Sequence, residues 1–288
     1  AVITPTVLQA SGAVADQVSD GSVQASLTGL NGAGIVTGDA VTVQASSAQF
    51  ADRNVSRDGA GSVLAKAVSV TGLSLSGADA GNYALMGSSF SAQAKILPRV
   101  LDVQVQAFDK MYDGTTAATG TLVAGNVVPG DLVQLSWGAG TFAGKDVSRN
   151  AQGQVQAQAV SFGSVQASGA DVGNYSLSGT VATGQASITP KVLQVTGTAV
   201  ADKMEDGDAS AKVTPGSLTG LVGQEQLQAT VSGSFRSASV GTDQPVDVLY
   251  TLLDGAGGGK AGNYAVPVQV LKASPWPRHQ SVSRLAMR

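Results

Sequence analysis

Hydrophobic and polar residues alternate over several short stretches of the chain. In residues 101–109, LDVQVQAFD, the leucine and both valines fall on one side of an extended backbone, and the aspartate and both glutamines fall on the other. A period of two residues is typical of a β-strand with one buried face. The same period occurs in DAVTVQAS (39–46), DLVQLSW (131–137) and EQLQATVS (225–232), each after a glycine-rich loop. We therefore predict short, half-buried strands along the whole chain.

Composition favours strands and turns over helices. The chain has 37 glycines, and of its 20 acidic residues all but Glu205 and Glu225 are aspartate. Aspartate and glycine favour turns and caps, whereas glutamate favours helix interiors. Clusters of glycine, serine and aspartate break the chain at intervals typical of antiparallel sandwiches and barrels.

One phrase of the sequence occurs three times. It reads GADAGNYAL at 77–85, GADVGNYSL at 169–177 and GGKAGNYAV at 258–266, so the glycines that open GNY lie 92 and 89 residues apart. An Asp-Gly pair recurs with its aspartates 93 and 93 residues apart, at Asp20, Asp113 and Asp206. A fixed long period is typical of tandem modules, and a shorter period of 20–30 residues, which a parallel β-helix would show, is absent.

The repeat divides the chain into modules of about 92 residues, a size that can bury its own core. We expect module 1 at 1–97, with its start truncated, module 2 at 98–190, module 3 at 191–272, and a basic, flexible tail at 273–288. A proline at each seam should stiffen the connection, at Pro5, Pro98 and Pro190. The predicted fold is all-β: three tandem, small, antiparallel, sandwich-like modules in an elongated array.

Aromatic residues mark the same place in each module. We interpret GNY as a corner in which the glycine and asparagine adopt turn geometry and the tyrosine begins the closing strand with its ring in the core. These structural landmarks are Tyr83, Tyr175 and Tyr264, together with Phe50, Phe142 and Phe235.

Module 2 resembles a known repeat. DKMYDGTTAA (109–118), TFAGKDV (141–147), GADVGNYSLSGT (169–180) and the closing ITPK, in this order, are similar to the YDG-type repeat of filamentous haemagglutinin-like bacterial adhesins. Module 1 keeps FADRNVS and GADAGNYAL, whereas module 3 departs most. The resemblance implies a surface-exposed or released protein, exported through two-partner secretion with an outer-membrane partner. It implies a role in attachment, aggregation or biofilm and no enzymatic activity.

Three residues of module 2 are candidate ligand contacts. Tyr112 of the YDG triplet is replaced by Ser19 in module 1 and by Glu205 in module 3, so a function that needs this tyrosine would belong to module 2 alone. Tyr112, Asp113 and Trp137 could together contact a glycan, although the alternation of Trp137 with Val133 and Leu135 predicts a ring that faces the core.

The sequence offers no catalytic, cofactor or metal site. The single histidine, His279, follows Pro-Trp-Pro near the end of the chain, and a Ser-His-Asp triad needs a positioned imidazole. GAGGGKAG (255–262) lacks the serine or threonine of a phosphate-binding loop, and ADKMEDGD (201–208) lacks the ligand order of a calcium loop. We interpret the first as a glycine-rich loop and the second as a charged hairpin turn.

Charge and hydropathy limit the partners. A net charge of −3 gives no reason to bind nucleic acid, and the apolar runs are too short to span a membrane. With no cysteine there is no disulfide, which is consistent with export unfolded but does not establish it. We expect an extracellular or cell-surface location and no cofactor. Candidate partners are a host or bacterial surface glycan or protein, or a matrix polysaccharide.

These observations leave three hypotheses. The first is a non-enzymatic stalk or adhesive segment of a large secreted adhesin. The second is an array of carbohydrate-binding modules with its contact mainly in module 2. The third is an enzyme fragment whose catalytic domain lies outside these residues. For the tail, whose arginines and prolines break the strand pattern, the alternative to a flexible end is an element that holds the protein to its secretion partner or to the envelope.

Overall fold

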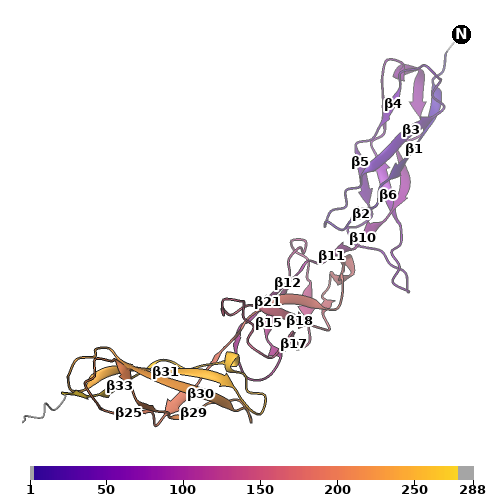
Figure 1. Cartoon of the computed structure of the whole chain (residues 1–288). Coiled ribbons are helices and arrows are strands. Elements are labelled where there is room, and N and C mark those ends of the chain that lie inside the picture. The colour runs from indigo at the N-terminus through magenta and orange to yellow at the C-terminus, as the bar shows by residue number, and fades with distance from the viewer. Residues whose placement is uncertain (1–2, 278–288) are drawn as a thin grey trace, which may run out of the picture. The chain divides into compact units, whose positions relative to one another are not determined.

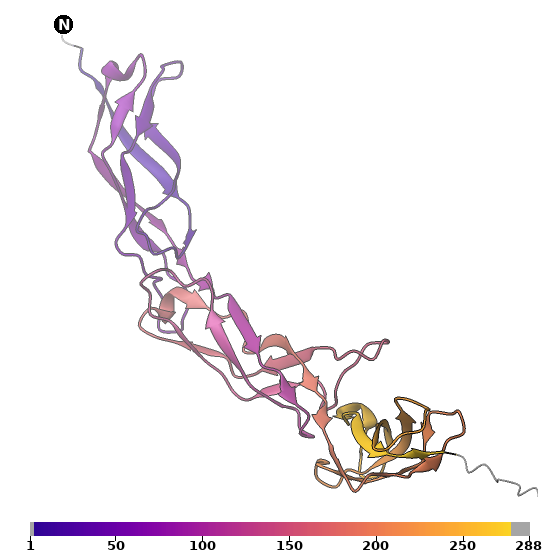
Figure 2. The same cartoon turned by 90° about the vertical axis from the view of Figure 1, so that its left-hand side faces the viewer.

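The computed structural model describes residues 3–277. These residues form strands and turns, with three single-turn 3-10 segments and no α-helix among them (Figures 1 and 2). The prediction of an all-β fold is therefore confirmed.

Module 1 has two three-stranded sheets, β3-β1-β8 and β5-β6-β9, and two strand pairs, β4-β7 and β10-β2. Its core lies on β6, where Val68 and Val70 are fully buried and pair across the antiparallel register with residues of both β5 and β9. The elements are β1 (Thr6–Val14), β2 (Gln17–Val18), β3 (Leu27–Ala33), β4 (Thr42–Gln44), β5 (Ser47–Phe50), β6 (Lys66–Thr71), β7 (Ser74–Ser76), η1 (Ala80–Asn82), β8 (Tyr83–Leu85), β9 (Ser89–Ala94) and β10 (Ile96–Leu97).

Module 2 repeats this plan with shorter strands. A four-stranded sheet runs β14-β17-β18-β21, and β16 pairs antiparallel with β19. The elements are β11 (Arg99–Val100), β12 (Val103–Ala107), β13 (Lys110–Met111), β14 (Ala117–Ala118), β15 (Gly120–Ala124), β16 (Gln134–Ser136), β17 (Gly140–Phe142), β18 (Gln158–Phe162), β19 (Gln166–Ser168), η2 (Val172–Asn174), β20 (Tyr175–Ser176), β21 (Ala182–Ala186) and β22 (Ile188–Thr189).

Module 3 is built on a longer sheet, β27-β30-β31-β33, in which β30 and β31 pair antiparallel from Leu227 with Asp254 to Phe235 with Val246. Its core gathers on Phe235, Val246, Val248 and Tyr250. The elements are β23 (Lys191–Val192), β24 (Gln194–Thr196), β25 (Ala199–Val200), β26 (Lys203–Met204), β27 (Ser210–Ala211), β28 (Val213–Thr214), β29 (Ser217–Thr219), β30 (Leu227–Phe235), β31 (Gln244–Asp254), η3 (Ala261–Asn263), β32 (Tyr264–Ala265), β33 (Gln269–Ala273) and β34 (Pro275–Trp276).

Each GNY motif is a corner, as its turn residues indicate. A 3-10 turn ends at the asparagine, and the tyrosine opens the next strand with its ring buried. That strand pairs in parallel with the strand that follows the seam proline: β8 with β1, β20 with β11, and β32 with β23. Alternation predicts antiparallel modules and does not predict these parallel pairs. The pairs form between strands from opposite ends of a repeat, which a local pattern cannot connect.

The tail begins later than predicted. Pro275 and Trp276 form β34, which pairs in parallel with β26 of module 3. Residues 273–276 therefore belong to module 3, because they supply the closing strand that Ile96 and Ile188 supply elsewhere. The rest of the predicted tail, including His279, lies outside the described residues.

Contacts divide the chain differently from the repeat. One compact unit contains Ala1–Val105, Leu122–Gly138 and Phe162–Ala182, and the other contains Gln106–Thr121, Ala139–Ser161 and Thr183–Arg288. Each unit thus joins one outer module to part of module 2: the first unit contains the seam at Pro98, and the second contains the seam at Pro190.

Candidate functional site

The GNY tyrosine has the same polar partners in every module. Its hydroxyl donates to a carboxylate and accepts a backbone N–H from a valine three residues before that carboxylate. The sets are Tyr83 with Asp39 (2.5 Å) and Val36 (3.1 Å), Tyr175 with Asp131 (2.7 Å) and Val128 (2.8 Å), and Tyr264 with Glu225 (2.6 Å) and Val222 (3.0 Å). A buried hydroxyl needs such partners, so the tyrosine fixes the loop that carries the carboxylate.

In modules 2 and 3 this corner receives a loop from the preceding module. We call the receiving residues the socket: Val128, Asp131, Asp171, Asn174 and Tyr175 in module 2, and Val222, Glu225, Lys260, Asn263 and Tyr264 in module 3. We call the inserted residues the plug: Gly21, Arg53, Asn54 and Val55 in module 1, and Gly114, Lys145, Asp146 and Val147 in module 2. Each plug comprises an Asp-Gly turn and the loop after the buried phenylalanine of FADRNV or FAGKDV.

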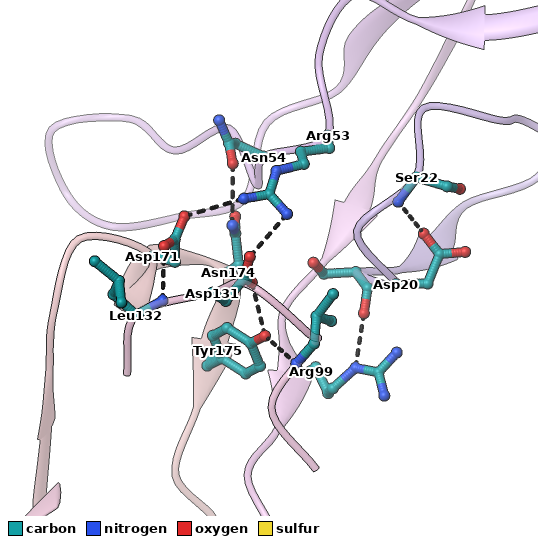
Figure 3. A network of polar contacts seen from close by, with 12 residues as sticks. Asp20, Ser22, Arg53, Asn54, Arg99, Asp131, Leu132, Asp171, Asn174 and Tyr175 are labelled. Atoms are coloured by element: carbon teal, nitrogen blue, oxygen red, sulfur yellow. Dashed lines mark hydrogen bonds and ion pairs between the residues drawn. The ribbon is translucent and has the colours of Figure 1, made fainter. Parts of the chain in front are cut away.

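Arg53 is the cation of the first joint (Figure 3). Its guanidinium lies 2.7 Å from Asp131 and 3.4 Å from Asp171, and the Asp131 side chain is only 1% exposed. A buried carboxylate is costly unless it is paired and hydrogen-bonded. Asp131 meets both conditions, because its other oxygen accepts the hydroxyl of Tyr175.

The asparagine of GNY binds the plug through both ends of its amide. Asn174, 4% exposed, accepts the backbone N–H of Val55 at 2.8 Å. Its amide nitrogen donates to the side-chain oxygen of Asn54 at 3.0 Å (Figure 3). In the second joint, Asn263, 1% exposed, accepts the N–H of Val147 at 2.8 Å and donates to Asp146 at 2.8 Å. Asparagine is the residue type with one acceptor and one donor at this spacing, which explains its recurrence.

The Asp-Gly turn lies against the socket valine. In all three copies the aspartate caps a backbone N–H two residues on: Asp20 with Ser22, Asp113 with Thr115 and Asp206 with Asp208. The following glycine has a positive φ, which glycine adopts without strain. A Cβ on Gly21 would lie 2.5 Å from the Val128 side chain, and one on Gly114 would lie 2.9 Å from Val222. Glycine at these two places therefore also permits close packing.

The second joint replaces the arginine contact with a tyrosine. Tyr112, 1% exposed, donates to Oε1 of Glu225 at 2.6 Å, while Tyr264 donates to Oε2 at 2.6 Å. The two rings meet edge to face with centroids 5.4 Å apart, and the Lys145 ammonium lies 3.7 Å from the same carboxylate. Burial, together with the hydrogen bond to Glu225, raises the pKa of Tyr264 to about 12 and raises the pKa of Tyr112 as well.

The two joints differ in the charge at one socket position, which is negative at Asp171 in module 2 and positive at Lys260 in module 3. Asn54 of the first plug faces a socket with Asp171, whereas Asp146 of the second plug pairs with Lys260 at 2.5 Å. Burial works to raise the pKa of Asp146, but the hydrogen bonds from Lys260 and Asn263 outweigh it and lower that pKa. The glycine-rich loop 255–262 thus carries a joint residue, Lys260, that its composition does not reveal.

The predicted ligand contacts have other partners. Tyr112, proposed as a glycan contact, is buried, and its hydroxyl donates to Glu225. Asp113 accepts from Lys110 at 2.8 Å and caps Thr115, so it is a turn residue. Trp137 is partly buried, as are Val133 and Leu135, in line with the predicted face. The phenylalanine landmarks, with 2–3% exposure, pack in the cores.

Residues 3–277 contain no group of three or more histidine, aspartate or glutamate side chains that could hold a metal. In ADKMEDGD, Asp202 accepts the N–H of Ser274, and Asp206 and Asp208 cap local turns. An open hollow of about 840 Å³ lies on the module 3 sheet, lined by residues that include Arg236, Asp247 and Leu249, and its arginine and aspartate pair with each other at 2.7 Å. No helix in the described part of the chain is long and apolar enough to cross a membrane.

The repeats that carry these residues match a known domain family. The YDG domain family matches residues 4–92, 97–183 and 189–271. The chain belongs to the YDG domain family and contains three of its domains in tandem.

No curated protein matches the chain. Among solved structures, it is similar to three N-terminal domains of the bacteriophage RB49 Highly Immunogenic Outer Capsid protein, with 10% identity, a TM-score of 0.30, and 94% of this chain and 99% of that chain covered. It is also similar to Drosophila N-cadherin EC1-4, with 8% identity, a TM-score of 0.21, and 95% and 75% covered. These scores are too low to support an inference about function.

Proposed function

We propose that this chain is a non-enzymatic stalk segment of a large secreted bacterial surface adhesin, in which successive YDG domains are fastened end to end. The segment spaces an adhesive region from the cell surface. Its location is extracellular, and an outer-membrane secretion partner exports it.

One observation carries the proposal: the residues that define the repeat are used to join one domain to the next. Asn174 and Asn263 bind the plug, Asp131 and Glu225 bind its polar side chains, and Tyr112 is buried in the second joint. A binding or catalytic module would hold its recurring polar residues open to a ligand.

The adhesin part of the proposal is supported by the order of YDGTTAA, FAGKDV and GNYSLSGT, which resembles the repeat of filamentous haemagglutinin-like proteins. A chain without cysteine also suits export through a pore before folding. Attachment, aggregation and biofilm formation are the processes in which such a stalk would serve.

Small-angle X-ray scattering of the whole chain tests the stalk. A compact globule of this length has a radius of gyration of about 19 Å. We expect a clearly larger value and a pair-distance distribution with a long tail. A value near that of a globule would contradict the stalk.

Binding measurements test whether the modules space or bind. We expect no binding of the chain to a glycan array at micromolar concentration. Glycan binding that is abolished by Trp137→Ala but unchanged by Tyr112→Phe would give the opposite result. It would favour a carbohydrate-binding array with its contact in module 2.

A further inference from the structure

Module 1 has a complete set of socket residues, and among residues 3–277 no plug lies in it. The residues at its socket positions are Val36, Asp39, Asp79, Asn82 and Tyr83, which are related to the other two sockets by the repeat. Asn82 is exposed, whereas Asn174 and Asn263 are buried, and Val36 is 58% exposed, whereas Val128 and Val222 are partly buried. Within residues 3–277, no ion pair involves Asp39 or Asp79.

This socket is already arranged for binding. The Tyr83 hydroxyl holds Asp39 as the Tyr175 hydroxyl holds Asp131. Asp79 accepts the N–H of Ala40 at 2.8 Å, as Asp171 accepts that of Leu132 at 2.9 Å. The contacts internal to the socket are thus present, and only those from a plug are missing. A surface held in its bound geometry binds at a lower entropic cost.

We infer that the socket of module 1 binds the plug of another YDG domain, one with arginine or lysine at the position of Arg53 and an uncharged residue at the position of Asn54. This inference rests on the proposed function and specifies the partner of the stalk at this face.

Charge selects that plug. Arg53 contacts both Asp131 and Asp171, whose counterparts in module 1 are Asp39 and Asp79, so the module 1 socket needs the same cation. A plug of the second type would bring an aspartate, the counterpart of Asp146, toward Asp79, where module 3 has Lys260 instead. Like charges brought together in an interface disfavour that pairing.

The same comparison disfavours the opposite end of this chain as the partner. At the plug positions of module 3, Ala238 stands where Arg53 stands in module 1, and Glu205 stands where Ser19 stands. Such a plug has no cation at the position of Arg53, because its arginine, Arg236, stands at the position of Ala51 and pairs with Asp247, and it adds an acidic residue at the position of Ser19. Head-to-tail binding between two copies of the chain is therefore disfavoured.

An extended chain tests the inference. Residues 3–95 are repeated directly before Ile3, so that the added domain joins module 1 as module 1 joins module 2, and only the added domain carries ¹⁵N, introduced by ligation. The measurement is hydrogen exchange at the Val55 amide of the added domain, the counterpart of the Val55 amide that donates to Asn174. We expect this amide to exchange about fivefold more slowly than when the following module carries Asn82→Ala, since a hydrogen bond contributes roughly 1 kcal/mol.

Two matched changes test the charge rule. Asn54→Asp in the added domain should abolish the protection, and Asp79→Lys in the following module should restore it by recreating the pair of Asp146 and Lys260. As a control, residues 188–274 replace the added domain, so that Val240 occupies the place of Val55. Its amide should exchange at the same rate with and without Asn82→Ala.

Equal exchange of the Val55 amide with Asn82 and with alanine would overturn the inference. Protection of the Val240 amide that depends on Asn82 would overturn the charge rule and assign the socket to a second copy of this chain. Because Asn82 is exposed, its replacement leaves the module 1 core intact. Scattering from the unextended chain is independent of these amides, so the stalk and the socket inference can fail separately.

Discussion

The hydroxyl of Tyr112 in module 2 donates to the carboxylate of Glu225 in module 3, across 113 residues of sequence. Glu225 accepts a second hydroxyl from Tyr264 of its own module, so one carboxylate connects the two modules. The tyrosine for which the repeat is named is therefore, in this chain, a residue of the joint.

Tyr112→Phe should destabilise this joint. The change leaves one oxygen of a buried carboxylate without its hydroxyl donor, and the expected loss in free energy of unfolding is about 1–3 kcal/mol. Urea unfolding followed by circular dichroism measures it. Tyr112→Phe and Tyr264→Phe should be non-additive, because both hydroxyls serve Glu225. Strict additivity would contradict a shared carboxylate.

Arg53→Met should weaken the first joint. It leaves the buried Asp131 without a cation, and because Arg53 itself is partly exposed we expect a loss of about 1–3 kcal/mol, below that of a fully buried pair. The comparison is Arg57→Met: the guanidinium of Arg57 also crosses this joint, to the carbonyl oxygen of Gly173, but it contacts no carboxylate, so we expect a smaller loss than for Arg53→Met. Adding Asp131→Asn to Arg53→Met should recover part of the loss.

Gly114→Ala should cost more than Gly207→Ala. Both glycines have similar positive φ angles, 78° and 80°, so both substitutions carry the same backbone strain. A Cβ on Gly114 would lie 2.9 Å from Val222, whereas nothing lies within 4 Å of one on Gly207. The difference in unfolding midpoint therefore isolates the contact at the joint. Equal shifts would mean that the Asp-Gly turn does not pack against the next module.

Lys260→Asp should destabilise the second joint, because it places an aspartate against Asp146. Asp146→Asn in the same chain should restore the unfolding midpoint by recreating the first type of joint, in which Asn54 faces the socket with Asp171. The loss of stability caused by Lys260→Asp alone should become smaller as salt is raised, since ions screen the repulsion between exposed charges. A double variant no more stable than Lys260→Asp would contradict the charge rule.

The second joint should weaken in alkali. In the unfolded chain tyrosine ionises near pH 10, whereas in the fold the pKa of Tyr264 is about 12 and that of Tyr112 is also raised. Because the folded protein holds both phenols neutral, their contribution to stability is complete below pH 10 and is lost as the pH rises through 12. Stability measured across this window should fall less steeply in the double variant Tyr112→Phe, Tyr264→Phe.

Much of the fold follows from local sequence. Alternation predicts the strands, and the turn geometry of glycine and asparagine predicts the GNY corners, which η1–η3 confirm. The parallel pairs, such as Thr6 with Tyr83, are not predictable in this way, because they join strands from the two ends of a repeat. Local sequence places residues 273–276 in the tail, because Pro275 and Pro277 break the alternating pattern and the strand β34 pairs only with the distant β26.

The joint could not be read from local pattern, since Arg53 and Asp171 lie 118 residues apart. The available signal is the recurrence of a basic residue, Arg53 and Lys145, three residues after a buried phenylalanine and four residues before a further arginine. Lys260 carried no such signal, because it replaces the aspartate of the other two modules and its role depends on Asp146.

The two sockets carry opposite charges at one position, Asp171 in module 2 and Lys260 in module 3, and this difference affects how the gene can gain further repeats by duplication. Duplication of the segment for module 1 would place an arginine and an asparagine against two aspartates, as in the existing first joint. Duplication of the segment for module 2 would place Asp146 against a new copy of Asp171 and create repulsion. Recombination should therefore add copies of the first kind more readily than copies of the second.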